Sequence, residues 1–276
     1  MNFFTPEARQ FKPWSSSKLS TLKCGLKFEW QYNQKIRQYE IPPELETNIN
    51  DDATKFGSGM HTALEFYAQG IELDEAIKQA SVKEKLVTSQ TEELMMYKNS
   101  IIIFERKLNT FKNAYSILDD DDYIEEELGA NSQLEPSGYN DGGTLLRGKA
   151  DRILFSPNGK VAILIDHKTG KSATLDYAED QLDFYTTLIF ANYPDVEIVR
   201  SGLYFPRLSE MLWAPIINRS DYPMDENNST VQRINTAIAS FYDTEEPSIN
   251  ITTLCKWCIY RRMCVIERRS RRKKVK

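Results

Sequence analysis

With 276 residues, 41% hydrophobic residues and a net charge of −5, the sequence is long and apolar enough for a packed domain, which excludes an intrinsically disordered chain. No apolar run approaches the roughly 20 residues of a membrane-spanning helix, and the first residues lack the order of a secretory signal. A soluble protein of the cytoplasm, or of a host cytoplasm if it is viral, is therefore expected.

The first third of the chain is predicted to be helical. Ser15 to Ser17 offer N-caps for a helix whose apolar residues recur every three or four positions up to Trp30. A second helix is expected over 55–69. A longer helical region is expected over 73–118, where one face is charged and the other apolar.

The pattern changes to strands after a run of four Asp at 119–122. Strands are expected over 123–128, 145–155 and 161–167, with Asn158-Gly159 as a two-residue hairpin turn between the last two. A helix over 177–191, strands over 197–205 and 210–216, and a helix over 226–242 follow. This order predicts an α/β (α+β) fold with a central mixed sheet flanked by helices.

Charge is distributed unevenly along the chain. Residues 261–276 contain nine Lys and Arg and one acid, a local charge of +8, so the other 260 residues sum to −13. A basic segment suits a polyanion such as DNA, because phosphate contacts release counterions. A solvated, disordered tail explains the same residues equally well.

The hairpin predicted over 145–167 brings two carboxylates together. A two-residue turn at Asn158-Gly159 places Asp151 opposite Asp166, with Cβ atoms about 4.5–5.5 Å apart. Lys168 then projects on the same side as Asp166. Facing carboxylates destabilise a sheet unless a divalent cation lies between them, and a neighbouring lysine assists an attacking water. Surface ion pairs with Lys149 and Lys168 are the alternative.

Four further residues are weighed beside this pair. His61 is predicted to lie on a helix with Glu65 one turn later on the same face, where a core or surface role is the ordinary interpretation. His167 alternates with Asp166, so its side chain is expected to point away from the site. Gln181 and Tyr185 share a helix face and are within reach of a phosphate group, although a polar helix face explains them as well.

The cysteines form a metal-type pattern. Cys255, Cys258 and Cys264 lie in the segment CKWCIYRRMC, and Cys24 lies far upstream. Disulfides are not expected in a reducing compartment, and soft sulfur ligands favour zinc or an iron–sulfur cluster, between which the spacing does not choose. Buried cysteines without a metal are the third alternative.

Taken in order, these motifs resemble the PD-(D/E)XK nuclease superfamily, in particular its RecB-like exonucleases with an iron–sulfur cluster, such as the AddB nuclease domain and the CRISPR-associated exonucleases of the adaptation module. The similarity runs from Ser15 to Cys264. Its motifs in this chain are SSSKLSTLKCGLKFEWQY, GSGMHTALE, LRGKADRI, ILIDHKTGK, QLDFY and CKWCIYRRMC. The family's usual Cys-Pro is Cys24-Gly25 here.

The resemblance implies a restriction-endonuclease-like core and a role for each motif. The expected metal ligands for Mg²⁺ or Mn²⁺ are His61, Asp151 and Asp166, and the expected catalytic residues are Asp151, Asp166, Lys168, Gln181 and Tyr185. Glu126 or Glu127 is expected to be an additional acid. A [4Fe–4S] cluster is expected on Cys24, Cys255, Cys258 and Cys264.

The expected organisation is one integrated domain in three parts: a helical region over 1–118, a nuclease core over 119–245 and a cluster segment with a basic tail over 246–276. The expected activity is metal-dependent exonucleolytic hydrolysis of DNA, expected to be single-stranded, in recombination, repair or phage DNA metabolism. A helicase or recombination protein is an expected partner. The alternatives are a non-catalytic iron–sulfur DNA-binding subunit and a zinc-stabilised structure-specific nuclease.

Overall fold

The computed structural model describes residues 2–46, 52–176 and 178–274. The contacts along the chain divide it into two compact units. Unit 1 comprises Met1–Phe3 and Asp52–Gln232, and unit 2 comprises Phe4–Asp51 and Arg233–Lys276.

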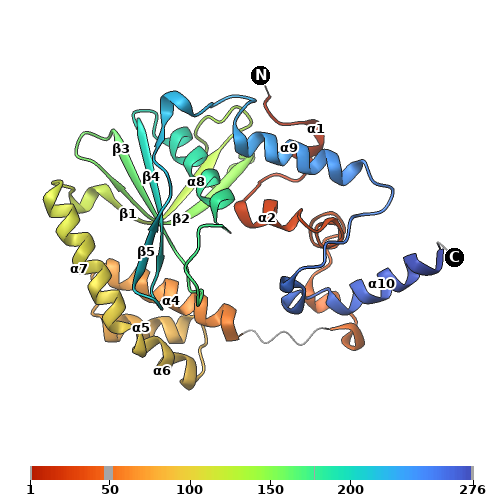
Figure 1. The fold of residues 1–276 in the computed structure, drawn as a ribbon, viewed down its shortest axis with the longest axis horizontal. Coiled ribbons are helices and arrows are strands. Elements are labelled where there is room, and N and C mark those ends of the chain that lie inside the picture. The colour runs from red at the N-terminus through yellow and green to blue at the C-terminus, as the bar shows by residue number, and fades with distance from the viewer. Residues whose placement is uncertain (1, 47–51, 177, 275–276) are drawn as a thin grey trace. The chain divides into compact units, whose positions relative to one another are not determined.

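Unit 1 is built on a mixed sheet (Figure 1). Strand order is β1-β2-β3-β4-β5, and β6 also pairs with β4. Only the pairing of β3 with β4 is parallel, while the other neighbours are antiparallel. The strands are β1 (Asp122–Ala130), β2 (Leu146–Phe155), β3 (Val161–His167), β4 (Ile198–Phe205), β5 (Glu210–Trp213) and β6 (Ile217–Asn218).

Helices cover both faces of this sheet (Figure 1). Helix α8 (Glu179–Asn192) connects β3 to β4 and packs on one face. The other face forms a core with α4 (Asp52–Ala68), α5 (Leu73–Lys83), α6 (Thr88–Met96) and α7 (Lys98–Ala114). The predicted mixed α/β fold is confirmed, and the longer helical region predicted over 73–118 consists of three helices, α5, α6 and α7.

The hairpin of β2 and β3 keeps the predicted register but not the predicted turn. Arg152 pairs with Ile165, as that register requires. The strands are joined by five residues, 156–160, of which Ser156 donates its backbone N–H to Val161 O at 2.9 Å. The two-residue turn is therefore wrong. Gly159 takes a φ of +68° in this loop, a conformation that favours glycine.

Unit 2 joins the two ends of the chain. Its N-terminal part contains α1 (Pro6–Gln10), α2 (Ser16–Thr21), α3 (Gly25–Phe28) and a π-helical turn, Glu29–Asn33. Its C-terminal part contains a 3₁₀ turn, Thr253–Trp257, and α10 (Arg261–Lys274). Helix α9 (Ser229–Tyr242) begins in unit 1 and ends in unit 2.

Two features of unit 2 differ from the prediction. The helix expected from Ser15 to Trp30 is interrupted before Cys24, which is the N-cap residue of α3. The basic C-terminal segment is helical as far as Lys274. The start of the helix predicted at Tyr177 lies outside the described residues.

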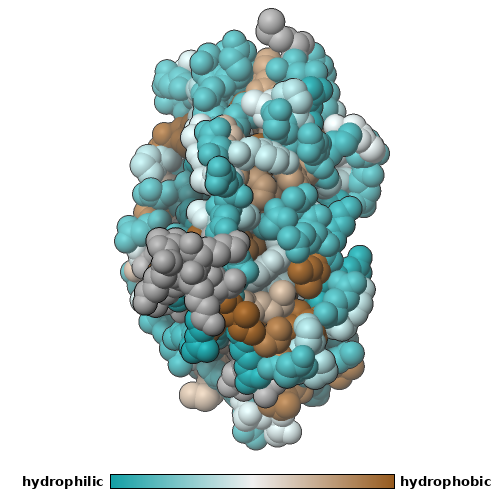
Figure 2. Space-filling model, turned by 90° about the vertical axis from the view of Figure 1, so that its right-hand side faces the viewer, coloured by the Kyte–Doolittle hydropathy of each residue, from teal (hydrophilic) through white to brown (hydrophobic). Residues whose placement is uncertain are grey.

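In the part of the chain that the structure describes, no helix combines the length and apolar character that crossing a bilayer requires. The face drawn in Figure 2 is mostly hydrophilic, with a smaller area of hydrophobic residues exposed between the hydrophilic ones.

Candidate active site

The acidic pair lies where β2 and β3 of unit 1 stop pairing. Arg152 and Ile165 are the last partners of this ladder toward the site, so Asp151 and Asp166 are the next residues along it. Asp166 is 4% exposed. The strands thus bring both carboxylates to the point where the β2–β3 ladder ends.

Asp166, Lys168 and Gln181 form a closed triangle of polar contacts. Lys168 Nζ lies 2.7 Å from Asp166 Oδ2 and donates to Gln181 Oε1 at 2.7 Å. Gln181 Nε2, on α8, donates to Asp166 Oδ1 at 2.9 Å. The lysine is therefore held in one position by two partners, and its ammonium group lies against the carboxylate of Asp166.

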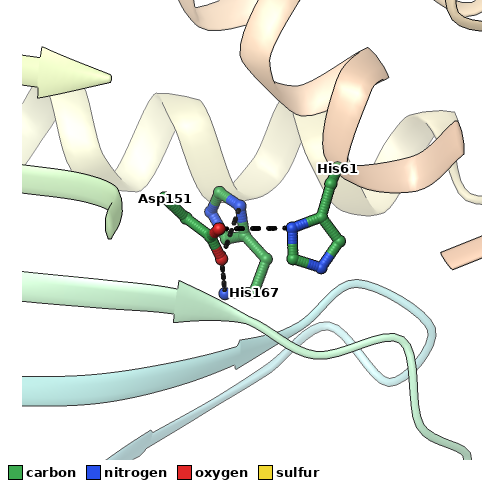
Figure 3. Close-up of side chains that lie close together, drawn as sticks. All are labelled: His61, Asp151 and His167. Carbon is green, nitrogen blue, oxygen red and sulfur yellow. Dashed lines mark hydrogen bonds and ion pairs between the residues drawn. The ribbon is translucent and has the colours of Figure 1, made fainter. Parts of the chain in front are cut away.

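Asp151 lies between two histidines (Figure 3). Its Oδ1 is 3.3 Å from Nδ1 of His61 on α4, and its Oδ2 accepts from the backbone N of His167 at 2.6 Å. Nδ1 of the His167 ring is 3.9 Å from the same Oδ2. Among the described residues, His61, Asp151 and His167 offer metal-ligand atoms that all lie within 4.8 Å of one another.

The prediction that His167 points away from the site is therefore wrong. Its ring does lie on the face of α7, edge to face with Phe104 and Tyr204. In a regular strand, Gly148 and Leu154 would lie on the same face of the sheet, because an even number of positions separates them. In β2 they do not: a Cβ on Gly148 would meet Tyr185 of α8, whereas Leu154 packs in the core with α4 to α7 on the other face. Asp151 lies in this change of face, and its carboxylate contacts His61 of α4 and His167.

The neighbouring strand changes at the same place. Glu125 has a φ of +56°, and the ladder of β1 and β2 omits the pair Glu125 and Asp151. A non-glycine residue in the left-handed region is strained, which is common at functional sites. Glu125 Oε2 is 2.8 Å from Lys149 Nζ. Burial and then the charges of Asp151 and Glu65 hold the pKa of Glu125 above its usual value, against the effect of Lys149.

Glu125, which the sequence did not single out, is the acid of β1 that faces Asp151. Glu126 instead accepts from Tyr193 OH at 3.1 Å, and Glu127 is exposed. No sequence signal separates these three consecutive acids, because the choice depends on the backbone angle of Glu125.

The pKa values of the two aspartates are shifted in opposite directions. Burial opposes ionisation of Asp151, but the His61 imidazole and the His167 N–H lower its pKa to about 2. Burial and the charge of Asp151 raise the pKa of Asp166 to about 6, against the effect of Lys168. Perturbed pairs of this kind are typical of functional sites.

The histidines also differ. Burial lowers the pKa of His61. The hydrogen bond and charge of Asp151 and the charge of Asp166 raise this pKa by more than burial lowers it, so it lies above its usual value. Burial lowers the pKa of His167 to about 3, which leaves its ring neutral at ordinary pH.

Tyr185 connects α8 to β2. Its hydroxyl donates to the backbone O of Lys149 at 2.6 Å, and burial raises its pKa far above the usual value. Gly148 makes this approach possible, because a Cβ there would lie 2.7 Å from Tyr185 Cε1. Tyr185 therefore supports the strand that carries Asp151.

A model of the PD-(D/E)XK nuclease superfamily matches residues 13–265. The chain belongs to the PD-(D/E)XK nuclease superfamily. This membership supports a nuclease with DNA as its substrate and divalent metal ions as its cofactors. No curated protein matches the chain.

Two solved structures are similar to this superfamily member at low identity. One is a protein from Eubacterium rectale, provisionally described as an exonuclease, with a TM-score of 0.49, 11% identity and coverage of 91% of this chain and 90% of that chain. The other is SSO0001, with a TM-score of 0.33, 19% identity and coverage of 74% and 81%. Both scores are below 0.5, so the family assignment rests on the superfamily match.

The same match includes all four cysteines, which line one cavity of unit 2. The cavity has a volume of about 820 Å³, and its wall includes Cys24, Cys255, Cys258 and Cys264. None of the four is in a disulfide. Burial raises the pKa of Cys258 and of Cys264, and the other thiols raise both further. The fold thus brings Cys24 to the same cavity as Cys255, Cys258 and Cys264, although 231 positions separate Cys24 from Cys255.

Gly25 accounts for the departure from the Cys-Pro pattern. Its backbone N donates to Ser248 Oγ at 3.3 Å, and the next residue, Leu26, donates to Ser248 O at 2.9 Å. Proline has no N–H for this bond. A Cβ at position 25 would lie 2.9 Å from Ser248 N, so glycine allows the C-terminal segment to pass close to α3.

Proposed function

We propose that this protein is a metal-dependent exonuclease that hydrolyses phosphodiester bonds of single-stranded DNA and that carries a [4Fe–4S] cluster. The observation that supports it most is that Asp151 and Asp166 directly follow the last pair of the β2–β3 ladder, with Lys168 against Asp166 and His61 facing Asp151. The sequence motifs also support two further parts of the proposal. The protein is of the RecB-like subtype, and it acts in recombination, repair or phage DNA metabolism with a helicase or recombination protein as its partner.

The residues of the site fit a divalent cation. His61 Nδ1 and Asp151 Oδ1 are 3.3 Å apart, and two ligands about 2.0–2.2 Å from one ion are typically spaced by about 3–3.5 Å. The charge of Asp151 holds the pKa of buried Asp166 high, a cost that a bound cation would remove. His61, Asp151 and Asp166 would hold the ion.

A divalent ion bound there would supply Lewis-acid activation of water and charge stabilisation at the phosphate. Lys168 would supply the other part of the chemistry. Its Nζ, fixed by Asp166 and Gln181, would orient the attacking water and balance the charge that develops on the phosphate oxygens. Gln181 holds both Lys168 and Asp166, and Tyr185 holds the strand of Asp151.

The cysteine cavity fits a cluster better than a single zinc ion. Four thiolates around one zinc ion have sulfur atoms about 3.8 Å apart, given Zn–S distances of about 2.3 Å. Among the described residues, no three cysteine sulfur atoms lie within 4.8 Å of one another. A cluster with a sulfur ligand on each of four corners suits wider spacing. It would tie the N-terminal and C-terminal segments of unit 2 together.

The test uses anaerobically purified protein, end-labelled single-stranded DNA and Mn²⁺ or Mg²⁺. Asp166→Ala should reduce metal-dependent degradation by at least about 100-fold, while Asp195→Ala, at an exposed acid outside the site, should leave it unchanged. Product lengths will distinguish exonucleolytic from endonucleolytic cutting and give the polarity.

Three outcomes would contradict parts of the proposal. No degradation by protein that holds its cluster would favour a non-catalytic DNA-binding subunit. Equal activity of Asp166→Ala would remove Asp166 from the site. Zinc in place of iron and sulfide, with no broad absorption near roughly 400 nm, would favour the zinc-stabilised nuclease.

A further inference from the structure

His167 is a buried imidazole that packs against aromatic rings on one side. The residue is 6% exposed, and its Nε2 is buried without a hydrogen-bond partner. The ring is edge to face with Phe104 at 5.9 Å and with Tyr204 at 6.0 Å between centroids. A phenylalanine would fill this space without leaving a buried polar atom unpaired, so packing alone does not explain a histidine here.

The other nitrogen of the ring faces the candidate metal site. Nδ1 is 3.9 Å from Asp151 Oδ2, too far for a hydrogen bond. His61 Nδ1 approaches the other oxygen of the same carboxylate at 3.3 Å. The three residues come from α4, β2 and the end of β3, and their ligand atoms converge within 4.8 Å (Figure 3). Three ligand atoms from three separate elements thus converge, which is the usual arrangement of a protein metal site.

Asp166 lies beside this group and has other contacts. Its Oδ1 accepts from Gln181 Nε2, and its Oδ2 lies 2.7 Å from Lys168 Nζ. Among the described residues, His167 is in the group whose ligand atoms lie within 4.8 Å of one another, and Asp166 is not. His167 would therefore add a ligand to His61, Asp151 and Asp166.

We propose that the ring of His167 is a further ligand of the catalytic metal ion, so that two imidazole nitrogens bind the ion together with the carboxylates of Asp151 and Asp166. The inference rests on the proposed nuclease function and specifies the metal that the site takes. Imidazole suits transition-metal ions, whereas Mg²⁺ takes oxygen ligands. The site therefore binds a divalent transition-metal ion in preference to Mg²⁺.

The chain offers an unusually direct test, because it contains only two histidines. Protein made without a histidine tag is loaded with Mn²⁺, and pulsed EPR counts the imidazole nitrogens bound to the ion. Two imidazoles in the wild-type protein can only be His61 and His167, so this result supports the proposal without any variant. One imidazole overturns it and leaves the nuclease proposal intact.

A variant series adds a second readout. His167→Phe should leave one coupled imidazole and weaken Mn²⁺ binding by about 10-fold or more, with little change in Mg²⁺ binding, measured by calorimetry. Tyr204→Phe is the control for packing, since it keeps the ring beside His167 and should leave both values unchanged. His167→Gln replaces His167→Phe if the latter does not fold.

The outcomes separate the two proposals. The same single imidazole in wild-type protein and in His167→Phe, or an unchanged Mn²⁺ affinity, would overturn the role of His167. No Mn²⁺ binding at the site of wild-type protein, together with no metal-dependent cleavage, would overturn the proposed function itself.

Discussion

Asp151 and Asp166 belong to one hairpin, yet their surroundings push their pKa values in opposite directions. Asp151 receives the His61 imidazole and a backbone N–H, whereas Asp166 is buried beside the charge of Asp151. Two carboxylates so close ionise together only at a cost when no cation is present. The site thus reduces the stability of the metal-free protein, and that cost has a measurable pH dependence.

The first prediction concerns this cost. The pKa of Asp166 is raised to about 6, so the folded state binds more protons than the unfolded state between about pH 4 and 6. The contribution of Asp166 to the free energy of unfolding is therefore most favourable below pH 4, and it is lost as the pH rises through 6. In EDTA at pH 7.5, Asp166→Asn should therefore be more stable than wild type, by on the order of 1–2 kcal/mol after loss of the Lys168 ion pair.

Urea unfolding of both proteins at several pH values measures this difference. The advantage of Asp166→Asn should shrink below about pH 5 and disappear near pH 4. An advantage that is constant with pH, or that grows in acid, would show that Asp166 has no raised pKa in the folded protein.

The second prediction separates Lys168 from metal binding. Its ammonium group contacts Asp166 and Gln181 and none of the residues grouped around Asp151. Lys168→Met should lower the cleavage rate by about 10²–10⁴-fold while Mn²⁺ affinity stays within about 3-fold of wild type. Rapid-quench cleavage and Mn²⁺ calorimetry on one preparation measure both, and a parallel loss of the two would make Lys168 a structural support of the ion.

At the scale of elements, a buried ionic network joins α7 to the strands of the site. Arg152 of β2 bonds Glu105 of α7 at 2.6 Å and Asp122 of β1 at 2.6 and 2.7 Å. Lys112 of α7 also bonds Asp122, at 2.8 Å. Arg152 directly follows Asp151, so this network fixes the strand that carries the metal ligand.

The third prediction is that Arg152→Met destabilises unit 1 strongly. Removal of the guanidinium leaves the buried carboxylate of Glu105 without its ion-pair partner and leaves Asp122 with Lys112 alone, which costs on the order of 3–5 kcal/mol. Arg106→Met, at an exposed position of the same helix, is the control and should change the free energy of unfolding by less than about 0.5 kcal/mol. A loss below about 1 kcal/mol for Arg152→Met would mean that solvent reaches the network.

The hairpin shows how far the sequence predicts the site and where it stops. Its register follows from local pattern and a turn signal, so the pairing of Arg152 with Ile165 was predictable even though the loop type was not. The positive φ of Glu125 and the ring position of His167 were not predictable, because both depend on partners from other elements. The break before Cys24 likewise depends on Ser248, more than 200 positions away.

The fourth prediction concerns that close approach. Gly25→Ala places a Cβ 2.8 Å from Ser248 Oγ and 2.9 Å from its N, which should displace the segment leading to the cysteine triplet. We expect lower iron and sulfide content per chain and faster loss of the cluster in air. Gly143→Ala, where a Cβ would meet nothing within 4 Å, is the control. Full iron content in Gly25→Ala would show that the segment tolerates the shift.

At the scale of the whole molecule, charge separates by unit. The acidic residues of the site lie in unit 1, while the basic α10 lies in unit 2 beside the cysteine cavity. Arg262 and Arg269 are exposed on this helix. Trp257 is 46% exposed, with Lys256 Nζ 3.9 Å from its ring centroid. Cations with an exposed aromatic ring suit a single strand, which offers phosphates and unstacked bases.

The last prediction tests whether this end of unit 2 binds the substrate. Each phosphate contact of a single strand contributes about 0.7 to the slope of log K against log salt concentration. Arg262→Gln with Arg269→Gln should therefore weaken binding of single-stranded DNA and reduce that slope by up to about 1.4. Lys78→Gln with Lys85→Gln removes the same charge from exposed positions of unit 1 and should leave the slope unchanged. A local contact surface depends on the position of each lysine and arginine, whereas a diffuse electrostatic field depends on the net charge. Equal effects of the two pairs of substitutions would therefore mean that net charge alone attracts the DNA.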